Sequence, residues 1–269
     1  MSRPEPFVRA AGAGPAVVCI HSNASTSGQW RGLGELLAPK YRVLAPDSYG
    51  SGKSPEWHSD RIIALSDEVA FLEPVFAQAE TPLTLVGHSY GAAVALIAAL
   101  ENPARVRALV LYEPTLFSLI DAEAPPPNQA DGIRAAVAAS SVALDAGDPD
   151  AAAGFFIDYW MGEGCWASMP DQRKSPIASS VANVRRWAHA LTTESTPLSA
   201  FRGLEIPVLY MVGKRSTASA HGIARILVPA LPQVTLVEFD ALGHMGPITH
   251  SAVVNAAIER FLEQAAPVR

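Results

Sequence analysis

Short apolar segments alternate with longer segments of helical periodicity along most of this chain. The apolar segments predict strands at 16–20, 43–45, 83–86, 106–111, 208–212 and 234–239. Most of the segments between them predict helices, at about 27–38, 60–79, 90–101, 218–231 and 249–265. Because such alternation arises when crossover helices join parallel strands, we expect an α/β fold with a doubly wound, mainly parallel sheet.

The alternation stops between Leu111 and Pro207. This gap of roughly ninety residues is too long for a single crossover, so it must contain structure of its own. A proline-rich segment at 121–129 comes first, and helix-like segments follow near 131–146, 149–161 and 176–193. We therefore expect a helical cap inserted into the α/β fold.

The cap is predicted to span 115–204, so that the α/β core consists of 1–114 and 205–269. Its aromatic side chains could line an apolar substrate pocket. Helix-spaced aromatic residues more often hold helices together, and we favour packing for most of them. The residues concerned are Phe155, Phe156, Tyr159, Trp160, Trp166 and Trp187.

Composition and charge narrow the class of protein. The 269 residues are 49% hydrophobic and 17% charged, which is typical of a well-buried globular domain. A net charge of −6, with no long basic run, gives no reason to expect a nucleic-acid or membrane partner. The N-terminal residues lack the apolar segment of a signal peptide, so a cytoplasmic protein is expected. Cys19 and Cys165 are expected to be free thiols.

The most specific motif is Gly87-His-Ser-Tyr-Gly91, which stands between an apolar segment and an alanine-rich helical one. In the pattern G-x-S-x-G the serine occupies a strained strand-to-helix turn, and its small neighbours let the backbone bend sharply. The helix that follows offers free N–H groups to an oxyanion. The pentapeptide alone is weak evidence, but its strand–turn–helix context is the one that the motif requires. Ser89 is therefore the predicted nucleophile.

With this motif the chain resembles the α/β-hydrolase family over essentially its whole length. Residues 17–24 (VVCIHSNA) occupy the place of the family's strand-ending His-Gly-x loop. The resemblance implies an oxyanion hole formed by the N–H groups of Asn23 and Tyr90. Ser22 replaces the usual glycine, which affects the backbone path, and His21 is interpreted as a histidine whose hydrogen bonds are satisfied within the loop.

The segment 47–54 (DSYGSGKS) is similar to the family's Asp-x-x-Gly-x-Gly-x-Ser loop. It also contains Gly-Lys-Ser, the end of a phosphate-binding loop. That motif needs a glycine five positions before its Gly-Lys, and Asp47 stands there instead. We therefore reject the phosphate-loop interpretation.

The general base must be one of seven histidines. His244 lies just after the last predicted strand, between Gly243 and Gly246, which matches the family's histidine loop. A neutral imidazole can take the serine proton and return it to a leaving group. His88 is adjacent to Ser89, but neighbours on a tight turn point apart. His244 is therefore the predicted base.

The acid that orients this histidine is missing from its usual place. In many family members it follows the strand that corresponds to 208–212, yet residues 214–217 read KRST. Another place in the family is the end of the preceding strand, where Glu113 stands before Pro114. The order Ser89, Glu113, His244 keeps the family's order along the chain. Glu113 is the predicted acid; a water-assisted dyad, Asp47 and Asp240 remain alternatives.

These residues predict a serine hydrolase that cleaves a small or medium carboxylic ester through an acyl-enzyme. A carbon–carbon bond hydrolase or an acyltransferase would use the same residues, and a non-catalytic ligand-binding member of the fold is a third alternative. No cofactor is implied, and no metal site is expected, because His21, His58 and Asp60 lack metal-ligand spacing on one element. The expected partner is a small-molecule substrate, and a homo-oligomer remains compatible with the sequence.

Overall fold

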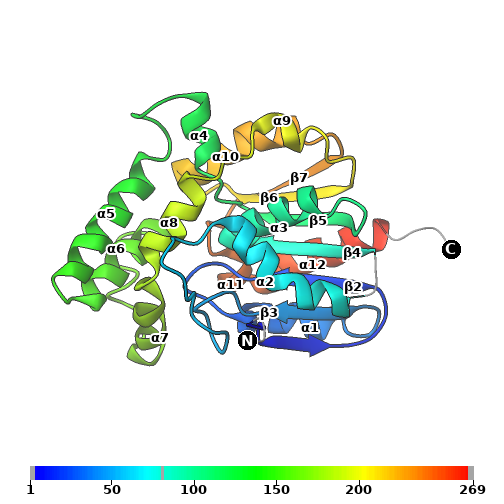
Figure 1. Cartoon of the computed structure of the whole chain (residues 1–269), viewed down its shortest axis with the longest axis horizontal. Coiled ribbons are helices and arrows are strands. Elements are labelled where there is room, and N and C mark those ends of the chain that lie inside the picture. Colours follow the sequence, from blue (N-terminus) through cyan, green and yellow to red (C-terminus); the bar gives the residue numbers. More distant parts are fainter. Residues whose placement is uncertain (1–3, 80–81, 266–269) are drawn as a thin grey trace.

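The computed structural model describes residues 4–79 and 82–265, and a sheet of seven strands forms its centre (Figure 1). The strands lie in the order β1-β3-β2-β4-β5-β6-β7, and β1 runs antiparallel to β3 while the other pairs are parallel. They are β1 (Val8–Ala11), β2 (Ala16–Ile20), β3 (Arg42–Pro46), β4 (Leu83–His88), β5 (Val106–Tyr112), β6 (Val208–Gly213) and β7 (Val234–Phe239).

The strand predictions differ from the structure mainly at the carboxyl ends. β4, β5 and β6 continue past their predicted ends to His88, Tyr112 and Gly213. Pairing with the neighbouring strands holds these residues in the sheet: His88 lies opposite Tyr112, and Gly213 lies opposite Phe239. β1 was missed because its sequence, VRAA, is short and half exposed and carries no apolar run.

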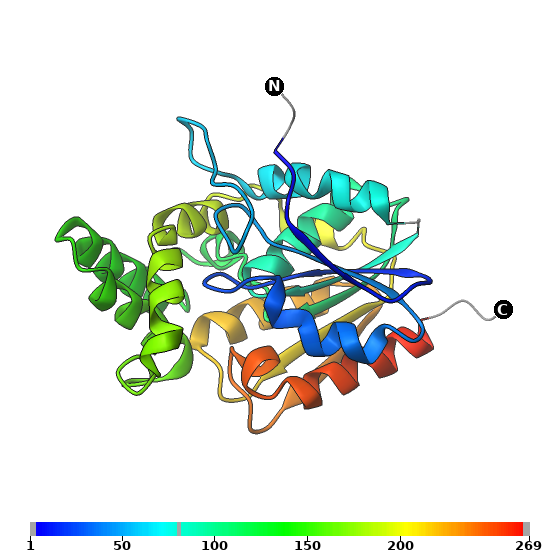
Figure 2. The same cartoon turned by 90° about the horizontal axis from the view of Figure 1, so that it is seen from below.

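Helices cover both faces of the sheet (Figure 2). Each face has its own apolar core. Helices α1 and α12 pack on one face, and α2, α3 and α10 pack on the other. These elements are η1 (Ser27–Trp30), α1 (Arg31–Leu37), α2 (Leu65–Gln78), α3 (Tyr90–Glu101), α10 (Ala218–Leu227), η2 (Val228–Ala230), α11 (Gly246–Thr249) and α12 (Ser251–Gln264).

The largest differences between the predicted and observed helices concern 60–79 and 176–193. The helix expected at 60–79 begins only at Leu65, where the Asp67 side chain accepts a hydrogen bond from the Ala64 amide (2.8 Å) and so closes the first turn. The single helix expected at 176–193 is wrong: α7 (Asp171–Val181) ends before a turn, and α8 (Val184–Thr192) follows it.

The long gap between β5 and β6 is helical, as predicted. Helices α5 to α8 stand beyond the end of the sheet at which β4, β5 and β6 terminate (Figure 1). That 115–204 is a separate cap domain stays a prediction. The helices of the gap are α4 (Ser118–Glu123), α5 (Asp131–Asp145), α6 (Pro149–Met161), α7, α8 and α9 (Leu198–Phe201).

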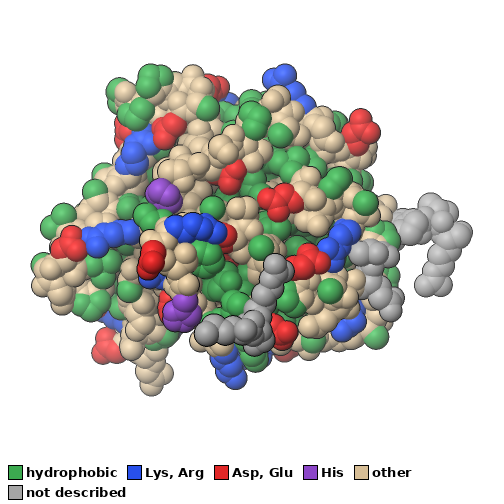
Figure 3. Space-filling model, viewed as in Figure 1, with side chains coloured by type: hydrophobic (Ala, Val, Ile, Leu, Met, Phe, Trp, Pro, Cys, Tyr) green, Lys and Arg blue, Asp and Glu red, His purple; other side chains and the backbone are tan. Residues whose placement is uncertain are grey.

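The described residues also bear on the expectations for membrane-spanning helices, surface charge and cysteines. Within 4–79 and 82–265, no helix is both long and apolar enough to cross a membrane. On the face shown in Figure 3, acidic and basic side chains lie interspersed among apolar ones. Cys19 and Cys165 are free thiols, as predicted, and burial raises the pKa of the Cys19 thiol.

Candidate active site

Ser89 lies in the sharp turn that joins β4 to α3. Its backbone has φ 56° and ψ −117°, a conformation that residues with a side chain rarely adopt. A hydrogen bond from the Ser89 amide to the Tyr112 carbonyl (2.9 Å) holds this turn against β5. The motif glycines leave room for it, since a Cβ on Gly91 would lie 2.4 Å from the Ile20 carbonyl oxygen, and one on Gly87 would lie 2.4 Å from the Ala92 Cα. Larger residues would push α3 away from the sheet.

The structure brings the predicted nucleophile, base and acid into one line of hydrogen bonds. His244 Nε2 lies 2.9 Å from Ser89 Oγ, and His244 Nδ1 lies 2.7 Å from Glu113 Oε2. A carboxylate only accepts, so Nδ1 carries the proton and Nε2 is free to accept one from the serine hydroxyl. All three side chains are buried, with exposures of 6% for Ser89, 2% for His244 and 0% for Glu113.

Glu113 has a full set of hydrogen-bond donors. Besides His244, the Gly213 amide donates to Oε1 (2.8 Å), and the Ser216 hydroxyl donates to Oε2 (2.5 Å). Its own backbone has φ 45°, which turns the side chain out of β5 toward β6. Three donors to a fully buried carboxylate are what a stable charge requires in this environment.

The two alternative carboxylates contact other groups. Asp47 accepts hydrogen bonds from the Ser27 amide (2.6 Å) and the Lys53 amide (2.9 Å), so it holds the 47–54 loop together. Asp240 forms an ion pair with Lys214 (2.7 Å) and is 86% exposed. Neither contact involves His244.

The predicted oxyanion residues are both close to Ser89. Asn23 lines the same cavity as Ser89, and Tyr90 opens α3, where a first-turn amide has no partner within the helix. Next to Asn23, Ala24 has φ 54°. Among the described residues, Ala24, Ser89 and Glu113 are the non-glycine residues with positive φ, and all three follow the carboxyl ends of neighbouring strands. Backbone strain is therefore concentrated at this site.

A largely buried chain of polar side chains next to Ser89 was not predicted from the sequence. His88 Nε2 donates to the His244 carbonyl (2.8 Å), so its Nδ1 accepts from the Gln29 amide group (3.1 Å). The Gln29 carbonyl oxygen in turn accepts from both the Ser22 amide (3.2 Å) and the Ser22 hydroxyl (3.1 Å). Burial holds the pKa of His88 well below its usual range, which keeps it neutral. This chain links the histidine loop to the loop that carries Asn23.

His21 has its hydrogen bonds satisfied, but only one of the two lies within its own loop, as predicted, and the other comes from the 47–54 loop. Its Nδ1 donates to the Ser22 carbonyl (2.7 Å), and its Nε2 accepts from the Ser48 amide (3.0 Å). Burial lowers the pKa of this imidazole. His21 therefore joins its own loop to the 47–54 loop, and both of its ring nitrogens have partners other than Ser89.

The aromatic residues between β5 and β6 divide between packing and pocket. Trp160 stacks on the His244 imidazole, with ring centroids 3.8 Å apart and planes at 22°. Phe156 and Trp187 line the same cavity as Ser89. Phe155 is 49% exposed, and buried Trp166 packs beside Gly154. The helical spacing of these residues did not reveal which of them face Ser89.

Two cavities meet at Ser89. The first, called here the α5/α8 cleft, has a volume of about 420 Å³ and is mostly apolar. The second, called here the wide cleft, has a volume of about 1100 Å³ and a more polar lining that includes Glu56, Arg173 and His244. Asn23, Ser89, Phe156 and Trp160 line both. Each cavity is large enough for a small ligand.

Glu68 is a buried carboxyl group close to this site. Its Oε1 accepts from the Tyr90 hydroxyl (3.3 Å), its Oε2 accepts from the Tyr49 amide (3.3 Å), and its exposure is 2%. Burial raises the pKa of Glu68 from 4.5 to about 8. Between these values the folded protein holds a proton that the unfolded chain has released, so stability falls as the pH rises from about 4.5 to about 8.

We expect Glu68→Gln to remove this pH dependence, because glutamine stays neutral. The wild-type free energy of unfolding should decrease by on the order of 2–4 kcal/mol across this pH interval, relative to the variant. Urea unfolding at several pH values measures it, with Glu35→Gln on the exposed side of α1 as the control. An equal pH dependence in Glu68→Gln and the wild type would contradict the prediction.

The sequence profile described as alpha/beta hydrolase fold matches residues 15–251. The chain belongs to the α/β-hydrolase fold family. The predicted fold class and the resemblance to this family are confirmed. The described residues form a seven-stranded sheet, and Ser89 lies in a strand-to-helix turn, as the nucleophile does in this fold.

The chain shows only moderate sequence identity to individual relatives. The chain is 34% identical to an uncharacterised protein of Mycobacterium tuberculosis over 108 residues, a match that covers 38% of the chain and only 30% of that relative. It is 27% identical to a pimeloyl-[acyl-carrier protein] methyl ester esterase of Chromobacterium violaceum, over 96% of the chain and 98% of the relative. An esterase structure from Exiguobacterium antarcticum superposes with a TM-score of 0.78 at 19% identity, over 96% of the chain and 95% of that structure.

Proposed function

We propose that this α/β-hydrolase cleaves a small or medium carboxylic ester through an acyl-enzyme on Ser89. The observation that carries the proposal is the buried hydrogen-bonded line Ser89–His244–Glu113, which opens into two cavities. A serine hydroxyl becomes a competent nucleophile when an oriented base accepts its proton. Full-length similarity to an esterase supports the same class of reaction.

In the first half-reaction, Ser89 Oγ attacks the ester carbonyl carbon while His244 Nε2 takes the hydroxyl proton. The carboxylate of Glu113 stabilises the imidazolium that results and holds its Nδ1 proton in place. The backbone N–H groups of Asn23 and Tyr90 donate hydrogen bonds to the carbonyl oxygen and stabilise its negative charge. His244 then gives its proton to the leaving alcohol oxygen, and the acyl group remains on Ser89.

In the second half-reaction, water attacks the acyl carbon and gives a proton to His244 Nε2. The tetrahedral intermediate collapses, the carboxylic acid is released, and the proton returns to Ser89 Oγ. The helices of 115–204 act as a cap: Trp160 covers one face of the imidazole, which limits the access of bulk water to the base. A carbon–carbon bond hydrolase or an acyltransferase would use the same residues with a different scissile bond or acceptor.

The test is covalent labelling with a fluorophosphonate probe, followed by peptide mass spectrometry. We expect the label on Ser89, together with hydrolysis of short p-nitrophenyl esters. Ser89→Ala should abolish both, while Ser22→Ala, which leaves the proposed nucleophile in place, should still be labelled. A wild-type protein that neither reacts with the probe nor hydrolyses any ester would refute the proposal and favour a non-catalytic ligand-binding protein.

A further inference from the structure

Among the residues that line only one of the two cavities at Ser89, one decides the roles of the cavities. His244 lines the wide cleft, and within the described part of the chain it is not among the residues of the α5/α8 cleft. In ester cleavage the leaving oxygen must receive its proton from His244 Nε2, so the leaving group has to lie on the side of that nitrogen. This argument rests on the proposed function and assigns the alcohol part of the ester to the wide cleft.

The acyl group must then extend the other way from Ser89, into the α5/α8 cleft. The walls there are apolar side chains from helices α5, α6 and α8 and from the loop after β5. Ala138 of α5 and His189 of α8 line the cleft and are exposed. A cavity of this size and lining favours a hydrocarbon chain or ring. The apolar walls include Phe117, Ile133, Val137, Phe156, Trp187 and Leu191.

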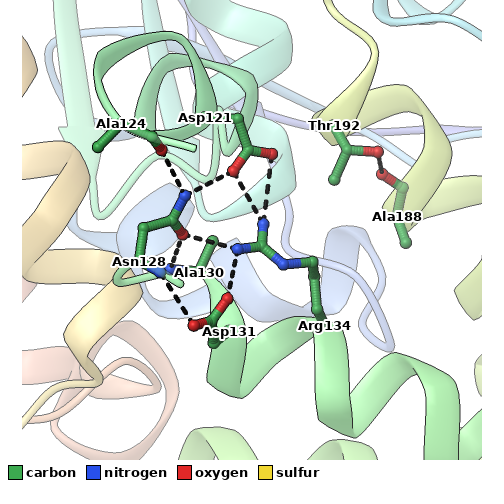
Figure 4. A network of polar contacts seen from close by, with 8 residues as sticks. All are labelled: Asp121, Ala124, Asn128, Ala130, Asp131, Arg134, Ala188 and Thr192. Atoms are coloured by element: carbon green, nitrogen blue, oxygen red, sulfur yellow. Dashed lines mark hydrogen bonds and ion pairs between the residues drawn. The ribbon is translucent and has the colours of Figure 1, made fainter. Parts of the chain in front are cut away.

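The cleft carries one positively charged side chain, and its charge is compensated. Arg134 Nη1 donates to Asp121 Oδ1 (2.9 Å), while Nη2 donates to Asp131 Oδ1 (2.6 Å) and Asn128 Oδ1 (2.7 Å). Figure 4 shows the guanidinium group held between these three side chains, with Thr192 of α8 across from it. Arg134 and its two aspartates together carry a charge of −1, so this cluster does not favour an anionic group.

We propose that the α5/α8 cleft binds the acyl group of the substrate and that this group is an uncharged, medium-length hydrocarbon chain. Esters whose acyl chain ends in a carboxylate are then poor substrates. A carboxylate near Asp121 would lose hydration and face a like charge, while Arg134 already has partners.

The position of the acyl group is tested by narrowing the mouth of the cleft. Ala138 is exposed and lines the cleft, whereas Ala135 is exposed on the same helix and is not part of the lining. We expect Ala138→Trp to lower kcat/KM for p-nitrophenyl octanoate by about 10-fold or more, with little effect on the acetate. Ala135→Trp should change neither.

The outcomes separate this inference from the proposed function. If the wild type hydrolyses no ester and is not labelled by the fluorophosphonate probe, the proposed function fails. If the esters are hydrolysed and Ala138→Trp behaves as Ala135→Trp at every chain length, only the acyl assignment fails. A second series varies the leaving group and uses octanoate esters of alcohols of increasing size. For each of these esters, Ala138→Trp should lower kcat/KM by no more than it does for p-nitrophenyl octanoate. A loss that grows with the size of the alcohol would also overturn the acyl assignment.

The charge preference is tested with two substrates of equal chain length. We expect the wild type to hydrolyse p-nitrophenyl hexanoate at least about 10-fold better, in kcat/KM, than the mono-p-nitrophenyl ester of adipic acid. Asp121→Asn should narrow this difference, because it leaves more of the Arg134 charge uncompensated. A wild-type preference for the adipate ester, or an unchanged ratio in Asp121→Asn, would overturn the assignment of charge preference to this cluster.

Discussion

His244→Gln is expected to lower kcat for p-nitrophenyl esters by about 10⁴–10⁶-fold. Glutamine can donate a hydrogen bond toward Glu113, but it cannot take up the Ser89 proton near pH 7. The activity that remains would come from the oxyanion donors and from substrate binding. Single-turnover and steady-state kinetics measure the loss, and thermal unfolding checks that the buried carboxylate has not destabilised the variant.

A control for this variant is His250→Gln, which changes a histidine of the same chain segment that contacts Thr249 rather than Ser89. It should retain wild-type kcat. If His244→Gln kept more than about a tenth of the wild-type rate while remaining folded, His244 could not be the base.

The second prediction concerns the acid: Glu113→Gln should lower kcat by about 10²–10⁴-fold. Its amide oxygen can still accept from the Gly213 amide, which leaves the amide NH₂ facing His244 Nδ1. Nδ1 then becomes an acceptor, the imidazole proton moves to Nε2, and Nε2 can no longer receive the serine proton. The decrease in kcat therefore comes from the wrong imidazole tautomer and not from a change in packing.

Ser216→Ala is the matched comparison, because it removes one hydrogen bond to Glu113 and keeps the carboxylate. Its kcat should fall by about 10-fold or less. In a His244→Gln background, Glu113→Gln should cause little further loss, since the two residues act as one unit. Near-wild-type activity of Glu113→Gln, or fully additive losses in the double variant, would show that the carboxylate does not act through His244.

The sequence supported the prediction of this constellation, although its members are far apart along the chain. Ser89 and His244 are 155 residues apart, and Glu113 and His244 are 131 residues apart. Each one follows a strand, and the carboxyl ends of parallel strands lie at the same edge of a sheet. The alternation of strands and helices was therefore enough to predict that Ser89, Glu113 and His244 lie close together in the folded chain.

Ser216 and Gln29 show what sequence alone could not reveal. Ser216 stands where many members of the family carry the acid, and only the folded chain shows that its hydroxyl donates to the carboxylate one strand away. Gln29 lies in a 3₁₀ turn with no motif around it, yet it connects Ser22 to His88. Such hydrogen bonds depend on side-chain directions across elements, which local propensity does not specify.

By itself, the sequence determined the alternation of elements, the long interruption after β5 and the identity of the residues with the right chemistry, because these are local properties of period, turn and side-chain type. The tertiary structure decided which aromatic residues face Ser89 and how Glu113 is surrounded by donors. It also showed that His244 lines one cavity and not the other. Packing between helices distant in sequence determines these features, and the shape of a cavity is a property of all its walls together.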